Sequence, residues 1–243
     1  MEKGIGAKND FRWRGGEISR VEGFSDAVFA FALTLLIVSL EVPKTFDKLV
    51  GTMRGFIAFA FCFLILVQLW YYHYIFFRRY GLQDFYTMAL NVILLFVILF
   101  YVYPLKFLAT LLLIAFTGAD LNVTLPNGLI APMIQQAQVS ELIVIYGLGF
   151  GSASLIFLLL YLHAYRKRGM LELNELEIFD TRGSILENLY LVGIAALSVI
   201  IATFGGTNSA GPAGFTYFLI GPIMTIHGFS RGKQRRKIEE LTK

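Results

Sequence analysis

A short charged segment stands directly before the first long apolar run of this sequence. Three charged side chains and one hydroxyl precede residues 27–40, which are apolar except for two further hydroxyls. A charge next to the apolar core of a bilayer is costly, so it normally has a partner and a function. Such groups can hold a cation, carry a proton, or form hydrogen bonds between helices. The charged and polar residues are Arg20, Glu22, Ser25 and Asp26, and the hydroxyls within the run belong to Thr34 and Ser39.

The composition is that of a membrane protein. Hydrophobic residues make up 56% of the chain and charged residues 16%, against roughly 45–50% and 25% in soluble domains. The mean hydropathy of +0.65 agrees. An enzyme needs clustered nucleophiles, bases or metal ligands in a site that water can reach, and three scattered histidines with the single Cys62 do not supply one. We therefore expect no enzyme activity, no fixed metal site and no cofactor.

Six segments are apolar enough to cross a bilayer, which takes about 20 residues in a helix. The third is the longest, and we expect one helix kinked near Pro104 rather than two segments. Glycines at 147, 149 and 151 in the fourth predict close helix packing. The sequence thus predicts an all-α integral membrane protein with six transmembrane helices in a single domain over residues 1–243. The predicted spans cover residues 21–42, 55–77, 85–116, 142–162, 185–204 and 211–229.

Basic residues gather in alternate loops and so indicate the orientation of the chain. They precede the first span, follow the second and sixth, and fill the connection between the fourth and fifth. We predict a multi-pass protein of the cell (inner) membrane with cytoplasmic N- and C-termini. The net charge of +4 lies mostly on that face and is typical of contact with the lipid bilayer rather than with nucleic acid. The acidic residues over 172–180 predict a solvated helix paired with nearby cations; a metal or proton sensor is the alternative.

The first predicted helix has two different faces. At about 100° per residue, an apolar stripe with a single hydroxyl lies on one side, and Glu22 and Asp26 lie on another. Ordinary helix packing is one interpretation of the stripe. Asp26 must meet a donor or water, and Arg20 is the expected counter-charge. The candidate donors are Trp70, His73 and Asn91, and the stripe consists of Phe24, Ala27, Phe31, Thr34, Leu35 and Val38.

Two local patterns resemble a known family. Residues 20–26 read Arg-x-x-x-Phe-Ser-Asp and residues 70–73 read Trp-Tyr-Tyr-His, as in bacterial relatives of the endolysosomal (transmembrane protein 175-type) potassium channel family. The resemblance implies a homotetramer of six-helix subunits, with four copies of the first helix lining a central pore and no carbonyl selectivity filter. It also implies a structural network behind the pore. The residues expected in that network are Arg20, Phe24, Ser25, Asp26, Trp70, His73 and Asn91.

The expected function is a potassium-selective channel in which monovalent cations pass a hydrophobic constriction and lose part of their water. The resemblance implies a constriction at Phe31, Leu35 and Val38, with the permeant K⁺ near the hydroxyl of Thr34. Phe31 is bulkier than the aliphatic residue usual at the first constriction. The alternative for Thr34 is a hydrogen bond from its hydroxyl to the carbonyl of Ala30. The alternative for the chain is a proton-coupled membrane transporter or a proton-permeable channel.

Overall fold

The computed structural model of this chain describes residues 11–38, 44–118, 121–124, 128–206 and 209–241. Within these ranges the structure is helical apart from one short β-hairpin, so the prediction of an all-α fold is confirmed in its main part. The helices of 19 residues or more are α1 (Arg20–Val38), α3 (Phe56–Tyr80), α4 (Phe85–Thr117), α5 (Gln136–Arg166), α6 (Glu175–Phe204) and α8 (Ile220–Leu241).

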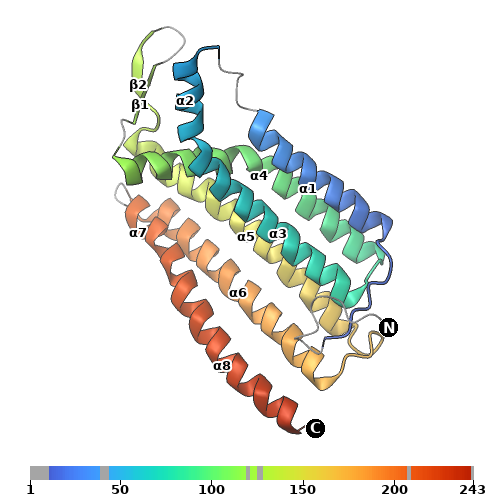
Figure 1. Cartoon of the computed structure of the whole chain (residues 1–243). Coiled ribbons are helices and arrows are strands. Elements are labelled where there is room, and N and C mark those ends of the chain that lie inside the picture. Colours follow the sequence, from blue (N-terminus) through green and yellow to red (C-terminus); the bar gives the residue numbers. More distant parts are fainter. Residues whose placement is uncertain (1–10, 39–43, 119–120, 125–127, 207–208, 242–243) are drawn as a thin grey trace.

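The long helices lie side by side, and the short elements gather at one end of them (Figure 1). The short elements at that end include α2 and an antiparallel hairpin in which Val123 is paired with Ala131. The described N-terminal segment and the end of α8 lie at the opposite end. The shorter elements are α2 (Phe46–Arg54), β1 (Asn122–Thr124), β2 (Ile130–Pro132), α7 (Ala210–Phe215) and the 3-10 helix η1 (Thr216–Leu219).

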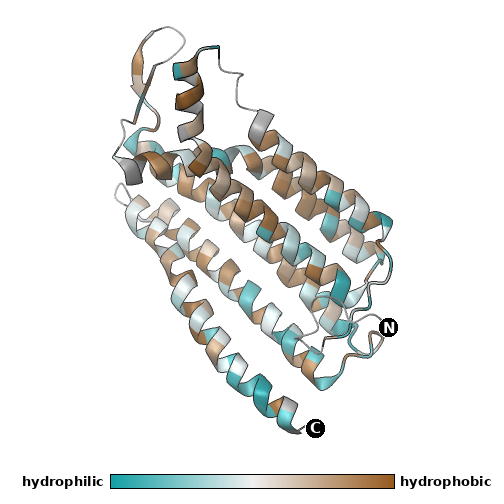
Figure 2. Cartoon of the chain, in the orientation of Figure 1, coloured by the Kyte–Doolittle hydropathy of each residue, from teal (hydrophilic) through white to brown (hydrophobic). Residues whose placement is uncertain are grey.

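Four helices of the described chain are long and apolar enough to cross a membrane, by length and composition. Only 22–33% of the residues in their most apolar windows are buried within the chain, so the remainder are left for lipid or another subunit. Hydrophobic residues cover α3 and α4, whereas hydrophilic ones gather where α6 and α8 approach the end with both described termini (Figure 2). Membrane crossings by α1 and by residues 211–229 remain a prediction. The four helices are Phe56–Tyr80, Phe85–Ile114, Gln136–Arg166 and Glu175–Phe204.

Several helices extend beyond the apolar segments that predicted them. Both α5 and α6 continue past residues 142–162 and 185–204 at their polar ends, which a hydropathy pattern does not register because the helix itself continues outside the apolar layer. The long third segment is one helix with Pro104 inside it, and the hydroxyl of Tyr146 donates to the Pro104 carbonyl. The last segment is divided among α7, η1 and α8.

One face of α1 is buried against α3 and α4. Ser25, Phe29, Ala32 and Leu36 recur every three or four residues, which places them on one side of a helix, and all four are buried. The ring of Phe29 lies 5.7 Å from that of His73 on α3. Helix α1 therefore has a fixed rotation, with its opposite side turned away from its own subunit.

Glycines of α5 bring three helices close together. A Cβ atom on Gly149 would lie 2.1 Å from the ring of Tyr101 on α4, and one on Gly147 would lie 2.5 Å from the side chain of Val199 on α6. Real Cβ atoms do not approach so closely, so any other residue at either position would force the neighbouring side chain to shift. The predicted close packing at these glycines is confirmed.

Candidate functional site

The buried side-chain amide of Asn91 joins helices α1, α3 and α4. The Nδ2 of Asn91 on α4 donates to the Ser25 hydroxyl of α1 at 2.9 Å. Its Oδ1 lies 2.8 Å from Nε2 of His73 on α3, and the Ser25 hydroxyl donates to the carbonyl of Val21 at 2.8 Å. Because an amide oxygen only accepts, Nε2 of His73 carries a proton. All three side chains are 0–1% exposed, so none of these groups has water as a substitute partner.

Asp26 forms a second contact between α1 and α3. Its Oδ1 accepts a hydrogen bond from the indole N–H of Trp70 at 2.8 Å, and the Trp70 ring stacks on Tyr74 at 5.8 Å. Unlike Ser25, Asp26 is exposed within the single chain. Its carboxylate therefore lies at the edge of the buried network and helps to hold α1 against α3.

Arg20 and Phe24 do not join this network within the subunit, although the sequence predicted both there. Arg20 is exposed, and no hydrogen bond or ion pair joins its side chain to the described residues. Asp26 lies six positions further on, which is about 9 Å along the axis and roughly 120° around it, so the expected pair does not form across the helix. Phe24 is 59% exposed and lies on the outward side of α1.

Helix α1 begins with a capping box formed by Ser19 and Glu22. The backbone N–H of Ser19 donates to the Glu22 carboxylate at 2.9 Å, and the backbone N–H of Glu22 donates to the Ser19 hydroxyl at 3.2 Å. These contacts satisfy two of the donors that a helix start leaves unpaired. The spacing Ser-x-x-Glu was the available signal for this role, which the sequence analysis missed.

The outward face of α1 is apolar with one hydroxyl. Ala27 and Thr34 are exposed, Phe31 is 55% exposed, and Leu35 is half-buried at the edge of the core. The Thr34 hydroxyl donates to the carbonyl of Ala30 at 2.9 Å, as the alternative for this residue predicted. The side chain of Val38 lies outside the described residues. The described chain thus presents an apolar surface on α1 that its own helices leave uncovered.

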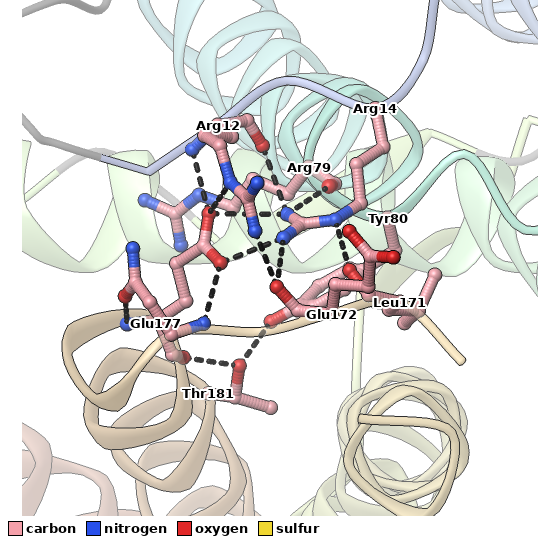
Figure 3. A network of polar contacts seen from close by, with 9 residues as sticks. Arg12, Arg14, Arg79, Tyr80, Leu171, Glu172, Glu177 and Thr181 are labelled. Atoms are coloured by element: carbon pink, nitrogen blue, oxygen red, sulfur yellow. Dashed lines mark hydrogen bonds and ion pairs between the residues drawn. The ribbon is translucent and has the colours of Figure 1, made fainter. Parts of the chain in front are cut away.

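A buried carboxylate ties the segment before α1 to the rest of the protein (Figure 3). Glu177 on α6 is 1% exposed, and Nη2 of Arg14 lies 2.6 Å from one of its oxygens. The backbone N–H groups of Arg12 and Asn174 donate to the same carboxylate at 2.8 and 3.0 Å. The prediction of a solvated acidic helix is therefore wrong for Glu177, whose charge is buried and compensated.

The same cluster extends to the end of α3. The backbone N–H of Arg14 donates to the carbonyl of Arg78 at 3.0 Å. The hydroxyl of Thr181 donates to the Glu177 carbonyl at 2.6 Å and lies 2.8 Å from the hydroxyl of Tyr80. The chain leading into α1 is thereby fixed to both α3 and α6. No sequence signal for this cluster was available beyond the charges themselves.

Asp84 organises a further contact at the same end of the protein. It caps α4 by accepting from the N–H of Thr87 at 3.1 Å, and it lies 3.1 Å from His163 and 3.0 Å from Lys167 at the end of α5. Burial raises the pKa of Asp84, but the hydrogen bonds from His163, Lys167 and Thr87 outweigh it, so its pKa lies well below the usual range. Asp84 is therefore a charged link between α4 and α5.

No group of three or more His, Cys, Asp or Glu side chains among the described residues is placed to hold a metal ion. What the geometry provides is an α-helical membrane protein whose first helix is fixed by a buried polar network and presents an apolar face outside its own subunit. The chain belongs to the endosomal/lysosomal potassium channel TMEM175 family. The family model matches residues 20–101, which contain every member of the Asn91 network.

Two relatives and one solved structure support this assignment. A potassium channel from Marivirga tractuosa is 42% identical over 241 residues, covering 98% of this chain and 97% of that protein. A potassium channel from Streptomyces collinus is 34% identical over 99 residues, covering 38% and 48%. A variant of the potassium channel MtTMEM175, crystallised with a nanobody–MBP fusion protein, has 42% identity and a TM-score of 0.81, covering 92% of this chain and 97% of that one.

Replacing Asn91 by Ala is expected to destabilise the subunit. The His73 N–H would lose its acceptor in a place closed to water, at a cost of about 1–3 kcal/mol for each stranded group. Asp26→Ala should cost less, because it strands only the indole N–H of the half-buried Trp70. The measurement is the apparent melting temperature of detergent-purified protein.

Gln83→Ala is the matched control, because this amide is exposed in the connection between α3 and α4. It should melt like the unmodified protein. Equal melting temperatures for the Asn91 and Gln83 variants would show that the buried bridge does not hold α1 in place.

Glu177→Gln is expected to loosen the N-terminal segment. It leaves the Arg14 guanidinium without its counter-charge, and breaking a buried pair costs roughly 3–5 kcal/mol. The lower end of that range applies because the Arg14 side chain is 16% exposed. Glu175→Gln, at an exposed site in the same turn of α6, is the control. Thermal unfolding of the two variants at the same temperature would contradict this role for Glu177.

Proposed function

We propose that this chain is the subunit of a homotetrameric potassium channel in which four copies of α1 surround a central pore. The observation that carries the proposal is the outward face of α1, where Phe31 and Thr34 are exposed while the opposite side of the helix is buried. The relatives named above are potassium channels, which supports K⁺ as the permeant ion. A closed ring of identical subunits would cover this face with copies of itself and create an axial path.

The proposed pore has no carbonyl filter. The backbone of α1 is helical from Arg20 to Val38, so its interior carbonyls are engaged within the helix and do not replace the water around an ion. We place the constriction at rings of Phe31, Leu35 and Val38, where an ion loses part of its water against apolar walls. Since Na⁺ holds its water more tightly than K⁺, the same wall opposes Na⁺ more strongly.

The proposed role of Thr34 uses the lone pairs of its hydroxyl oxygen. A bond to the Ala30 carbonyl at 2.9 Å engages the hydroxyl hydrogen, and the oxygen keeps acceptor capacity on its other side. Four such oxygens in one ring would replace some of the water that K⁺ loses. The hydrogen bond to Ala30 and the contact with a cation are therefore compatible.

The proposed topology has six crossings: the four strongly apolar helices, α1, and residues 211–229, which α7, η1 and the first part of α8 share. We place the chain in the inner membrane of the cell, with both termini in the cytoplasm. The described N-terminal segment and the end of α8 lie at one end of the helices (Figure 1). That end contains Arg14, Arg78 and Arg79 as well as the basic residues of α8, as the excess of cytoplasmic positive charge requires.

Purified protein in liposomes tests the function directly. A K⁺ gradient alone, without a pH gradient, is expected to drive K⁺ current, and the reversal potential should show preference for K⁺ over Na⁺. A flux that appears only with a pH gradient would contradict the channel and favour the proton-coupled transporter. Current carried by protons in place of K⁺ would favour the proton-permeable channel.

Phe31→Ala is expected to raise K⁺ current several-fold and to weaken discrimination against Na⁺, because a smaller side chain widens the constriction and lets more water pass with the ion. Phe96→Ala on α4, where the ring is also well exposed, is the matched control and should leave both properties unchanged. Unaltered current in the Phe31 variant would remove this residue from the pore.

Thr34→Ala is expected to lower the K⁺/Na⁺ permeability ratio by removing the ring of hydroxyl oxygens. Thr34→Ser keeps the oxygen and should retain most of the ratio. The measurement is the reversal potential under opposing K⁺ and Na⁺ gradients. Equal ratios in the Ala variant and the unmodified channel would assign Thr34 to helix geometry alone.

A further inference from the structure

We propose that a groove bordered by α3, α6 and α8 binds an anionic phospholipid, with the headgroup at the end of the protein where both described termini lie. This groove plays no part in the proposed pore, which depends on the outward face of α1. Its volume is about 1030 Å³, at the top of the range of roughly 300–1,000 Å³ for small-molecule sites.

Most of the groove is lined by apolar side chains along the helices. All five long helices from α3 to α8 contribute to this lining. The apolar residues include Leu69 of α3, Leu105 of α4, Phe157 of α5, Leu191 of α6 and Met224 of α8. Such a surface suits an acyl chain lying parallel to the helices, because it offers that chain contact with apolar atoms over several helical turns.

One end of the groove is charged instead. Three arginines and two carboxylates line it, so cations are in excess. Nε of Arg235 lies 3.3 Å from Asp180, and Glu187 lies 3.6 Å from His227. The lining arginines are Arg79, Arg231 and Arg235, and the carboxylates are Asp180 and Glu187.

Two of the arginines make no close ion pair. Arg231 donates to the carbonyl of Phe179 and lies 3.8 Å from the centre of its ring, and Arg79 lies 4.9 Å from the ring centre of Phe11. No carboxylate oxygen of the described residues lies within 4.0 Å of either guanidinium. Asp180 and Glu187 compensate these charges only from a longer distance. The guanidinium groups therefore have donors available for a phosphate group, which arginine binds through planar, paired N–H groups.

A glycine makes room for one of these arginines. Gly183 on α6 is buried, and a Cβ atom there would lie 2.4 Å from Nε of Arg231. With no side chain at this position, the guanidinium lies close to the backbone of α6. The cationic end of the groove is thus shaped by the packing of α6 and α8, unlike a mobile surface charge.

The arrangement of charge and apolar surface selects an amphiphile. Basic pockets between membrane helices on the cytoplasmic side bind anionic headgroups, and here the pocket continues directly into an apolar groove. A soluble phosphate compound would leave the apolar wall unused. A helix from a second copy of the chain would place apolar residues along the groove but would offer the arginines no specific counter-charge.

Native mass spectrometry of detergent-purified protein tests the proposal with phosphatidylglycerol and phosphatidylcholine of matched acyl chains. Phosphatidylglycerol should be retained more strongly. Arg231→Gln and Arg79→Gln should each reduce that retention about five-fold, the effect expected for one arginine at an anionic headgroup. Arg236→Gln, at an exposed position of α8 outside the groove, is the control and should retain the lipid normally.

Four results would overturn the proposal. Equal retention of the two lipids, or an equal loss in the Arg236 variant, would show that no headgroup site exists at this end. Binding of glycerol 3-phosphate as tight as that of phosphatidylglycerol would assign the arginines to a soluble anion. A disulfide between copies of a Leu69→Cys variant would place another subunit in the groove. None of these readouts requires ion conduction, so they are separate from the test of the channel.

Discussion

The amide of Asn91 is the contact on which the arrangement of α1 depends. In an apolar surrounding, a polar side chain without a partner is costly, and a helix that carries one must rotate until the group is satisfied. Asn91 meets Ser25 of α1 on one side and His73 of α3 on the other. This bridge fixes which side of α1 is buried, and it thereby turns Phe31 and Thr34 outward, where the proposed pore requires them.

Contacts near both ends of α1 hold the helix in the same position as the Asn91 bridge does. The segment before it is fixed by Glu177 through Arg14 at 2.6 Å. Towards the other end, Nζ of Lys106 donates to the carbonyl of Leu36 at 3.0 Å. A helix held near each end and in between could keep the proposed apolar constriction at a defined radius, which the proposed partial dehydration of an ion requires.

The sequence predicts contacts best where polar residues are few. The contact of Asp26 with Trp70 could be anticipated, because an apolar helix offers its polar groups few alternative partners. The other two candidate donors for Asp26 contact other groups instead: His73 pairs with Asn91, and Asn91 donates to Ser25. The same reasoning failed for Arg20, since charge alone does not reveal that Asp26 lies on another side of the helix. The Arg14–Glu177 pair could not be predicted, because its members are 163 positions apart and an arginine before a membrane span is equally a signal of topology. Short elements such as α2 were missed because no apolar run marks them.

Accessibility of α1 to a charged reagent tests the central claim most directly. In a channel with Cys62 replaced by Ser, cysteines are placed singly at Ala27 and Thr34 on the outward face of α1, and at Phe100 on α4, which is 63% exposed in the single chain. A permanently charged, cationic thiol reagent is applied during K⁺ current recording. The account predicts irreversible block at both α1 positions and none at Phe100; current that survives at both α1 positions, or is blocked only at Phe100, would contradict a pore lined by α1.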